Sequence, residues 1–436
     1  MKNISIISPD TVPLQLTFNA PKIIYENSRE YSREDRCSRS TRLGLRAWKM
    51  AEELSSDEDF RVTLYIPDIY YPGDEYIVKD NISFIIKTYN IKVATWNWSE
   101  ELDRKLKGED FVIVQPSTGV GLLNCSVLPN KTNVILDGFV SMFAEMPCTL
   151  LGSSQIYKKI HWTRFADQYR QLIHRVNCIL YANDNQFCYY EGQLLSLNKL
   201  DWGAYQFSPL LKVPYGLDRK ETIIEKPEKS KTFRILWYGQ VYPWYYPEAL
   251  IDILADIDNI SIDFVNTIHP REKRSYYNYF SKFFEKVSDI SNIQVHEKAL
   301  GEKVDLYKEY DAGIVFARDW IEERYSVRSR ALDMVSAGLP VLLNKGNPLF
   351  SELEMLGIKD SLYPITEKTL VFDIQSLNED GEKKVKVSKK SFNTINNSFN
   401  WEETIAPLKD YIQKFFYDDT KKYWYVPRRV SETSNI

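Results

Sequence analysis

Short apolar runs alternate with amphipathic segments along the whole chain. Residues 4–7 are apolar, residues 43–54 carry apolar side chains at helical spacing, and residues 62–66 are apolar again. A strand, a helix and a strand in this order form a βαβ unit, in which the strands lie parallel. The first part of the chain therefore predicts a parallel sheet covered by helices. Further strands of this sheet are predicted at 93–95, 111–114, 134–136 and 178–182.

A charged segment with a proline, residues 225–234, separates this part from a second part of the same kind. Such a composition is typical of a linker. Beyond it, strands are predicted at 234–238, 260–265, 293–295, 311–316 and 340–343, and a terminal amphipathic helix at 401–416. We interpret residues 20–41 as a long loop and residues 378–391 as a charged surface stretch. The expected fold class is α/β, with two Rossmann-like doubly wound domains.

Composition narrows the classes of function. The chain has 436 residues, which favours two domains over one. Its net charge of −4 gives no reason to expect a nucleic-acid partner, and its five scattered cysteines form no CxxC pair that would indicate zinc or a disulfide framework. The N-terminus does not resemble a signal peptide, and no apolar run is long enough to span a bilayer. We expect a cytoplasmic protein.

The segment 321–347 crowds arginines and acids just ahead of a short helix that Gly338 ends. Its charged residues before and within that helix are Glu322, Glu323, Arg324, Arg328, Arg330 and Asp333. Backbone N–H groups at a helix start are unpaired, and the helix dipole favours an anion there. Arginine also binds phosphate through two parallel hydrogen bonds. The segment therefore predicts a phosphate site, and our hypothesis is a pocket for a nucleotide sugar.

Polar residues in the first part also follow predicted strands. Asp137 follows the strand at 134–136, Asp184 and Gln186 follow the strand at 178–182, and Arg46 lies at the start of the helix after the long loop. Ligands of parallel sheets bind beyond the carboxyl ends of the strands. An acid there either binds a ligand or fixes a loop, and Arg46 either reaches a ligand or lies in solvent.

Seven short segments, in order along the chain, resemble a subgroup of glycosyltransferase family 4. For example, Val213-Pro214-Tyr215-Gly216-Leu217 is similar to its VPFGL segment, and residues 322–340 are similar to its ETRFAFRTRVLDYLWAGLP segment. The other segments lie at 44–54, 135–145, 183–195, 236–247 and 269–270. The resemblance covers most of the chain.

This resemblance implies the GT-B architecture, in which two Rossmann-like domains face a cleft. It divides the chain into an N-terminal acceptor-side domain (1–212), a C-terminal domain for the nucleotide-sugar donor (213–395), and a C-terminal helix and tail (396–436) that pack back on the first domain. It implies a retaining sugar transfer that needs no metal and no other cofactor, in the synthesis of a polysaccharide, glycolipid or glycoconjugate.

The resemblance also assigns residues to roles. The catalytic set is Arg328, Arg330, Asp137 and His269, and the donor-binding set is Gly239, Gln240, Glu322, Arg324, Ser329 and Asp333. Arg46, Asp184 and Gln186 are expected on the acceptor side. The implied partners are a nucleotide sugar and a saccharide or lipid-linked acceptor. A lipid-linked acceptor would bring the protein to the inner face of a membrane, and homo-oligomer formation stays open.

The chain departs from the common family pattern at two places. Gln240 stands where an arginine is usual, and Tyr325 stands where the first acid of an acidic pair is usual. These departures keep two alternatives open: a catalytically silent GT-B subunit, and a GT-B enzyme of another reaction such as nucleotide-sugar epimerisation. For single residues, Arg324 is alternatively a surface ion pair with Glu322, and His269 a structural histidine.

Overall fold

The structure is a computed structural model that describes most, but not all, residues of the chain. The described residues are 1–8, 12, 23–26, 29–32, 42–67, 75–79, 83–89, 102, 105–116, 132–149, 154–199, 210–219, 232–239, 241, 245, 247–254, 257, 259–266, 282–283, 285–297, 306–379, 381–418 and 423–425. The predicted strand at 93–95 and the predicted site residues Gln240 and His269 lie outside these residues.

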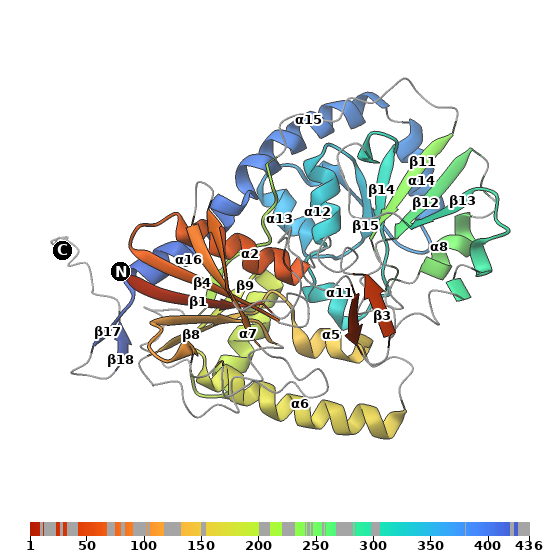
Figure 1. Cartoon of the computed structure of the whole chain (residues 1–436). Helices are drawn as coiled ribbons and strands as arrows, with labels where there is room; N and C mark the ends of the chain where they lie inside the picture. Colours follow the sequence, from red (N-terminus) through yellow and green to blue (C-terminus); the bar gives the residue numbers. More distant parts are fainter. Residues whose placement is uncertain are drawn as a thin grey trace, which may run out of the picture.

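The first half of the chain builds one large sheet, here called the first sheet, whose described strands follow the order β10-β9-β8-β7-β1-β4-β6-β5 (Figure 1). The strands are β1 (Lys2–Ile7), β4 (Phe60–Pro67), β5 (Glu75–Lys79), β6 (Ser83–Tyr89), β7 (Phe111–Val114), β8 (Asn133–Asp137), β9 (Cys178–Tyr181) and β10 (Leu210–Lys212). Neighbouring strands are parallel, except that β5 runs antiparallel to β6. Central strands such as β7 and β8 are buried along their whole length, as strands covered on both faces are.

Helices connect the strands of the first sheet. They are α2 (Arg42–Ser55), α5 (Met142–Thr149), α6 (Gln155–Arg175) and α7 (Asp184–Ser196). The helical spacing predicted for residues 43–54 is confirmed, because Ala47, Met50, Ala51 and Leu54 of α2 are buried. We call this sheet and its helices the first domain.

The second half builds a second sheet, and among the described residues its order is β13-β12-β11-β14-β15-β16, with every neighbouring pair parallel. Its strands are β11 (Phe233–Tyr238), β12 (Ile260–Asn266), β13 (Ile293–Glu297), β14 (Ala312–Val315), β15 (Val341–Asn344) and β16 (Leu362–Ile365). The helices around it are α8 (Pro247–Leu254), α11 (Ile321–Tyr325), α12 (Ser329–Ser336), α13 (Leu349–Met355), the 3₁₀ turn η3 (Lys359–Ser361), α14 (Leu370–Glu379) and α15 (Gly381–Ser398). We call this the second domain. The predicted α/β class with two doubly wound halves is confirmed.

The last helix returns to the first domain, as expected. It is α16 (Trp401–Lys414), and Figure 1 shows it beside α2 and the N-terminus. The Asn133 side chain donates to the Tyr411 hydroxyl at 3.3 Å, and Gln413 donates to Asp57 at 2.5 Å. The ammonium group of Lys2 donates to backbone carbonyls at the end of α16, among them those of Gln413 (2.9 Å) and Phe415 (2.6 Å). The exact domain boundaries given above stay a prediction.

Several local predictions change. Residues 20–41 contain a hairpin of β2 (Ile23–Glu26) and β3 (Arg29–Ser32), and the chain ends with a second hairpin of β17 (Phe416–Asp418) and β18 (Tyr423–Tyr425). The stretch 378–391, predicted as a charged surface segment, lies largely in helix α15. Its many lysines obscure the helical pattern in the sequence, and in the described part of α15 the buried residues Ser391 and Ile395 lie four positions apart on one face.

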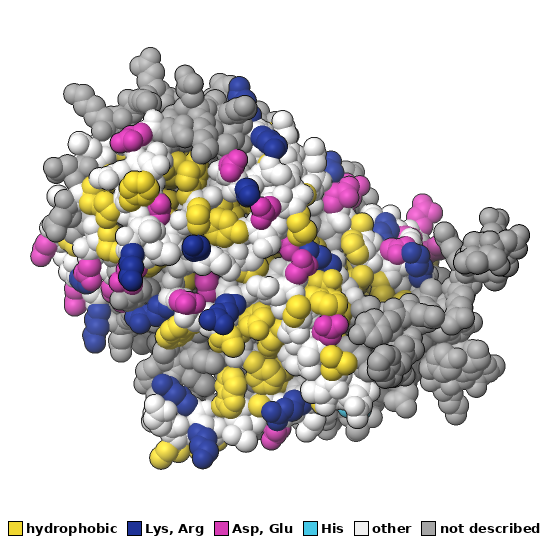
Figure 2. Space-filling view, turned by 180° about the vertical axis from the view of Figure 1, so that it is seen from behind, with side chains coloured by type: hydrophobic (Ala, Val, Ile, Leu, Met, Phe, Trp, Pro, Cys, Tyr) yellow, Lys and Arg dark blue, Asp and Glu magenta, His cyan; other side chains and the backbone are white. Residues whose placement is uncertain are grey.

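The surface is mixed in charge. On the face in Figure 2, basic and acidic side chains are interspersed among apolar ones, in keeping with the net charge of −4. Within the described ranges, no helix is both long and apolar enough to cross a membrane.

Candidate functional site

The segment 321–347 folds as the sequence predicts. It follows β14 and contains α11, a short turn and α12, after which Gly338, at φ = +88°, leads into β15. Arg328 is the N-cap residue of α12, and its carbonyl accepts the backbone N–H groups of Ala331 (2.8 Å) and Leu332 (3.1 Å). Helix α12 thus begins beyond the carboxyl end of β14, where parallel sheets bind ligands.

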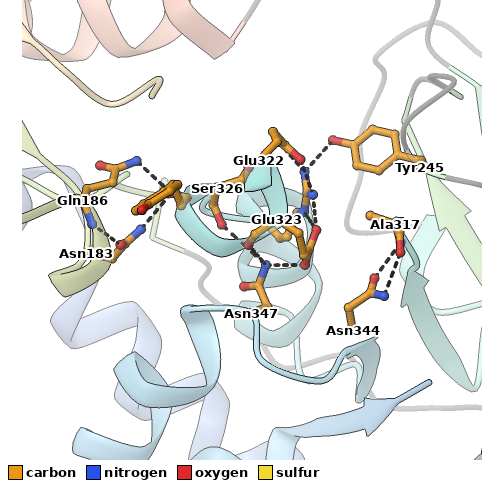
Figure 3. A network of polar contacts seen from close by, with 11 residues as sticks. Asn183, Gln186, Tyr245, Ala317, Glu322, Glu323, Ser326, Asn344 and Asn347 are labelled. Atoms are coloured by element: carbon orange, nitrogen blue, oxygen red, sulfur yellow. Dashed lines mark hydrogen bonds and ion pairs between the residues drawn. The ribbon is translucent and has the colours of Figure 1, made fainter. Parts of the chain in front are cut away.

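Arg328 is held by two carboxylates rather than open to a ligand. Its side chain donates to Glu322 at 3.0 and 2.7 Å and to Glu323 at 3.0 Å, with a further contact between Nη2 and Glu323. It also donates to the Tyr245 hydroxyl at 3.3 Å, and only 1% of Arg328 is exposed. Figure 3 shows Glu322 and Glu323 close together, with the Tyr245 hydroxyl directed towards them. The sequence predicted Arg328 as a catalytic residue, and the structure gives it a buried ion-pair network.

Burial and neighbouring charges shift the pKa values of Arg328 and Glu323 in opposite directions. Burial alone would lower the pKa of Arg328, but Glu322 and Glu323 raise it well above its ordinary value, so the guanidinium is charged. Burial raises the pKa of Glu323 above its usual range, and Arg328 opposes that rise. Asn347 donates to Glu323 at 2.6 Å and satisfies its other oxygen.

Arg330 lies against the end of the first strand of the second sheet. Gly239, directly after β11, has φ = +103°, and a Cβ atom there would lie 3.2 Å from the Cζ atom of Arg330. The Tyr245 ring contacts the guanidinium groups of Arg330 and Arg328, with its centroid 4.5 and 4.9 Å from their Cζ atoms. The predicted donor-binding residue Gly239 and the predicted catalytic residue Arg330 therefore lie side by side.

Two further predicted donor residues lie on α12. The hydroxyl of Ser329 is buried, and within the described residues it has no hydrogen-bond partner. Asp333 lies one turn further on and accepts a hydrogen bond of 2.6 Å from the Tyr307 hydroxyl. A buried hydroxyl at the start of a helix can donate to an anion.

In the first domain, Arg46 and Asp137 bind each other. The Nε atom of Arg46 lies 3.0 and 2.9 Å from the two carboxylate oxygens of Asp137. Arg46 also donates to the carbonyls of Val213 (2.9 Å) and Pro214 (2.8 Å), and its guanidinium lies over the Phe139 ring. This pair connects α2, the end of β8 and the chain that leads to the second domain. Their predicted roles towards a substrate stay predictions.

The other first-domain residues predicted for the site lie on α7. Asp184 is exposed and pairs with Lys212 at 3.1 Å. Gln186 is fully buried and donates to the carbonyls of Phe139 and Tyr325, both at 2.9 Å. The side chain of Arg324 is exposed, while Glu322, its alternative ion-pair partner, binds Arg328.

Some residues of the site were not identified from the sequence. Tyr245 is not among the residues predicted for the site, but its ring contacts both Arg328 and Arg330. Asn183 and Asn185 donate to backbone carbonyls at the end of α11. Their position just after the buried strand β9 could have identified these asparagines, because polar side chains beyond the carboxyl ends of parallel strands often contact ligands. In the described part, no cluster of histidine, cysteine or acidic residues is arranged to hold a metal ion.

Comparison with solved structures supports the fold assignment, whereas comparison of the sequence alone finds no match. No protein-family model and no curated protein matches the sequence. Sucrose-phosphate synthase from Thermosynechococcus elongatus is similar in structure, with a TM-score of 0.65 and 13% identity over 95% of this chain and 98% of that chain. Trehalose-6-phosphate synthase OtsA has a TM-score of 0.60 and 10% identity over 94% and 99% of the two chains.

HepE from Anabaena, in complex with UDP-glucose, has a TM-score of 0.59 and 10% identity, and the match covers 95% of this chain and 100% of that chain. Because these proteins share the GT-B architecture and match nearly the whole chain, the GT-B fold expected from the sequence is confirmed. The finer assignment to family 4 stays a prediction.

Proposed function

We propose that the protein is a glycosyltransferase that moves a sugar from a nucleoside diphosphate sugar to an acceptor hydroxyl. The fold supports this proposal, since similar structures were determined with UDP-glucose or UDP-2-fluoro glucose bound. The observation that carries it is the position of Arg330, whose guanidinium lies against the backbone of Gly239 beside the N-terminus of α12.

A diphosphate leaving group gains negative charge as the anomeric carbon–oxygen bond breaks. Groups that are already oriented towards this charge lower the barrier most. In our proposal Arg330, the Ser329 hydroxyl and the N–H groups of α12 bind the diphosphate, and Gly239 lets the backbone come close because it has no side chain. Asp333 would then lie one helical turn away, where it can accept hydrogen bonds from sugar hydroxyls.

The finer parts of the proposal follow from the same residues. The acceptor oxygen attaches to the face that the diphosphate leaves, which retains the anomeric configuration. A permanent arginine charge and a helix N-terminus replace the neutralising role that a metal ion has in other transferases. His269 and Gln240 keep their predicted place on the donor side, and a saccharide or lipid-linked acceptor is the proposed second substrate.

The test is incubation of the purified chain with UDP-, GDP- and ADP-sugars, with release of the free nucleoside diphosphate as the readout. Release with one donor, and its loss in Arg330→Ala, would support the proposal. The control is Arg170→Ala, since Arg170 is an exposed arginine on α6 whose ion-pair partner is the surface residue Asp167. Proton NMR of the product would establish the anomeric configuration.

A catalytically silent GT-B subunit is the second candidate, and specific observations favour it. Arg328 and Asp137, both predicted as catalytic, have their charges compensated by buried partners. Tyr325 stands at the place of the usual acid, and its carbonyl is bound by the first domain. Tight binding of a nucleoside diphosphate, with no release from any donor sugar, would support this candidate over the enzyme.

A further inference from the structure

Helix α11 of the second domain is capped by side chains of the first domain. The last carbonyl groups of a helix have no partner within it. Here the carbonyl of Arg324 accepts from the Asn185 amide at 2.7 Å, and the carbonyl of Tyr325 accepts from Gln186 at 2.9 Å and Asn183 at 3.2 Å. Figure 3 shows Asn183 and Gln186 directed towards this end of α11.

The amides that make this cap are fixed within their own domain. The oxygen of Gln186 accepts from the backbone N–H of Ala182 at 2.8 Å, and its amino group also donates to Phe139. The oxygen of Asn183 accepts from the backbone N–H of Gln186 at 3.0 Å and so caps α7. Because their oxygens are engaged, both amides present N–H donors to Tyr325 without a choice of orientation.

Two more contacts join the domains at the same place. The rings of Tyr189, on α7, and Tyr325 lie with their centroids 5.1 Å apart. Lys212, at the end of β10, donates to Glu352 of α13 at 2.9 Å. The carboxyl edges of the two sheets are therefore docked through polar, aromatic and ionic contacts around α11.

The other end of α11 is bonded to the residue at which α12 begins. Glu322 and Glu323, in its first turn, bind Arg328, and Arg328 is the N-cap residue of α12. A helix of this length spans only about 7 Å, because each residue rises about 1.5 Å. The first domain and the start of α12 are thus connected through a short helix with side-chain bonds at both ends.

We propose that Asn183, Asn185 and Gln186 are positioning residues, which hold α11 and, through Glu322, Glu323 and Arg328, fix the N-terminus of α12 that binds the diphosphate. We call these three residues the amide latch. The inference rests on the proposed function for its consequence at the donor site. It means that the second domain has an ordered donor site only when the first domain is docked on it.

The test uses a variant of the full chain that removes the donors and keeps the acceptors. In Asn183→Asp/Gln186→Glu, the side-chain oxygens can still accept from the backbone N–H groups of residues 186 and 182, but no amino group faces Tyr325 or Phe139. Asn185→Ala, which removes the bond to the Arg324 carbonyl and adds no charge, is measured beside it. The control is Gln375→Glu/Asn378→Asp, which makes the same two changes of side chain and charge at exposed positions of α14. If the double variant does not fold, Asn185→Ala replaces it, since Asn185 lies at the surface.

The first readout is amide hydrogen exchange by mass spectrometry. We expect peptides from 321–336 to exchange about tenfold faster in the double variant, because local opening becomes easier, while peptides from β1 and β4, for which no bond to Asn183 or Gln186 is changed, keep wild-type rates. Wild-type exchange of 321–336 in the double variant would show that the amide latch does not hold α11 and would overturn the inference.

The second readout is the affinity for UDP, measured by calorimetry. We expect the double variant to bind UDP about tenfold more weakly than the control, and Asn185→Ala, which places no charge in the interior, to weaken UDP binding in the same direction. Faster exchange with unchanged UDP affinity would overturn the connection to α12. If the wild type binds no UDP, GDP or ADP, the proposed function fails instead, and the exchange experiment still decides whether the latch exists.

Discussion

Arg46 and Asp137 form an ion pair in the interior of the first domain, with the Arg46 Nε atom 3.0 and 2.9 Å from the two carboxylate oxygens. At most 1% of either side chain is exposed. Since Arg46 also donates to the carbonyls of Val213 and Pro214, one guanidinium joins α2, β8 and the start of the connection to the second domain. Removal of either charge leaves the other buried without compensation.

We therefore expect Asp137→Asn to lower the free energy of unfolding by about 3–5 kcal/mol, the usual result when one member of a buried pair is lost. Asp167→Asn is the control, because Asp167 pairs with Arg170 at the surface and such pairs contribute at most about 1 kcal/mol. Urea unfolding followed by circular dichroism measures both. Equal destabilisation by the two changes would contradict a structural role for the buried pair.

A substitution at Gly239 tests the donor site without changing the charge of any residue. Gly239→Ala places a Cβ atom against Arg330 at a residue with φ = +103°. Gly108→Ala is the matched control, because Gly108 has φ = +102° and open space around its Cβ position. Both changes should cost about 1–2 kcal/mol of stability for the left-handed backbone.

Only Gly239→Ala should also weaken UDP binding, by about tenfold or more, because Arg330 must move from its place. Isothermal titration of UDP into both variants decides this. Similar affinities in the two variants would place the diphosphate elsewhere.

Lys2 caps a helix near the other end of the sequence. Its ammonium group donates to the carbonyls of Gln413 and Phe415, where the dipole of α16 favours a cation. We expect Lys2→Met to lower stability by about 1 kcal/mol and to speed hydrogen exchange at the end of α16. Lys158→Met, on α6, is a control with the same change of charge. Unchanged exchange in residues 409–415 of Lys2→Met would count against the cap.

Two cysteines should differ sharply in reactivity. Burial raises the pKa of the Cys178 thiol from 9.0 to about 12, although Tyr411 acts in the opposite direction, whereas Cys188 is exposed on α7. Because the thiolate is the reactive form, iodoacetamide at pH 8 should label Cys188 in the native protein and Cys178 only after unfolding. Peptide mass spectrometry measures both. Native labelling of Cys178 at the rate of Cys188 would contradict its burial.

The raised pKa of Cys178 also makes the free energy of unfolding depend on pH. The folded state holds the Cys178 proton more tightly than the unfolded state, so this contribution is complete below pH 9 and is lost as the pH rises from 9 to about 12. Cys178→Ala should remove that part of the alkaline loss of stability. Urea midpoints between pH 8 and pH 10 in the two proteins provide the comparison.

The sequence predicts the fold well because strands buried on both faces are continuous apolar runs, and β7, β8 and β14 are of this kind. It also predicts that Gly239 and the start of α12 meet, since both follow parallel strands of one sheet. The sequence does not predict the edge strand β5 and its neighbour β6, because β5 has only three apolar residues between Glu75 and Lys79, and Lys87 interrupts the apolar run of β6.

Partner choice among charged residues could not be predicted. The sequence does not distinguish the roles of Arg328 and Arg330. Arg328 forms ion pairs with Glu322 and Glu323, whereas Arg330 packs against Gly239. Likewise, nothing near Tyr325 in the sequence indicates that Gln186, from the other domain, would bind its carbonyl. These choices depend on packing between segments that are distant in the chain.

The return of α16 to the first domain has a consequence for biosynthesis. Ile405, Leu408 and Ile412 are buried on this helix, which packs beside α2. A ribosome that has completed residues 1–212 has not yet made the helix that covers this surface. The first domain is therefore synthesised first but completed last. A chain that a stop codon ends before residue 401 would lack α16, so the apolar surface that α16 covers beside α2 would be exposed and prone to aggregation.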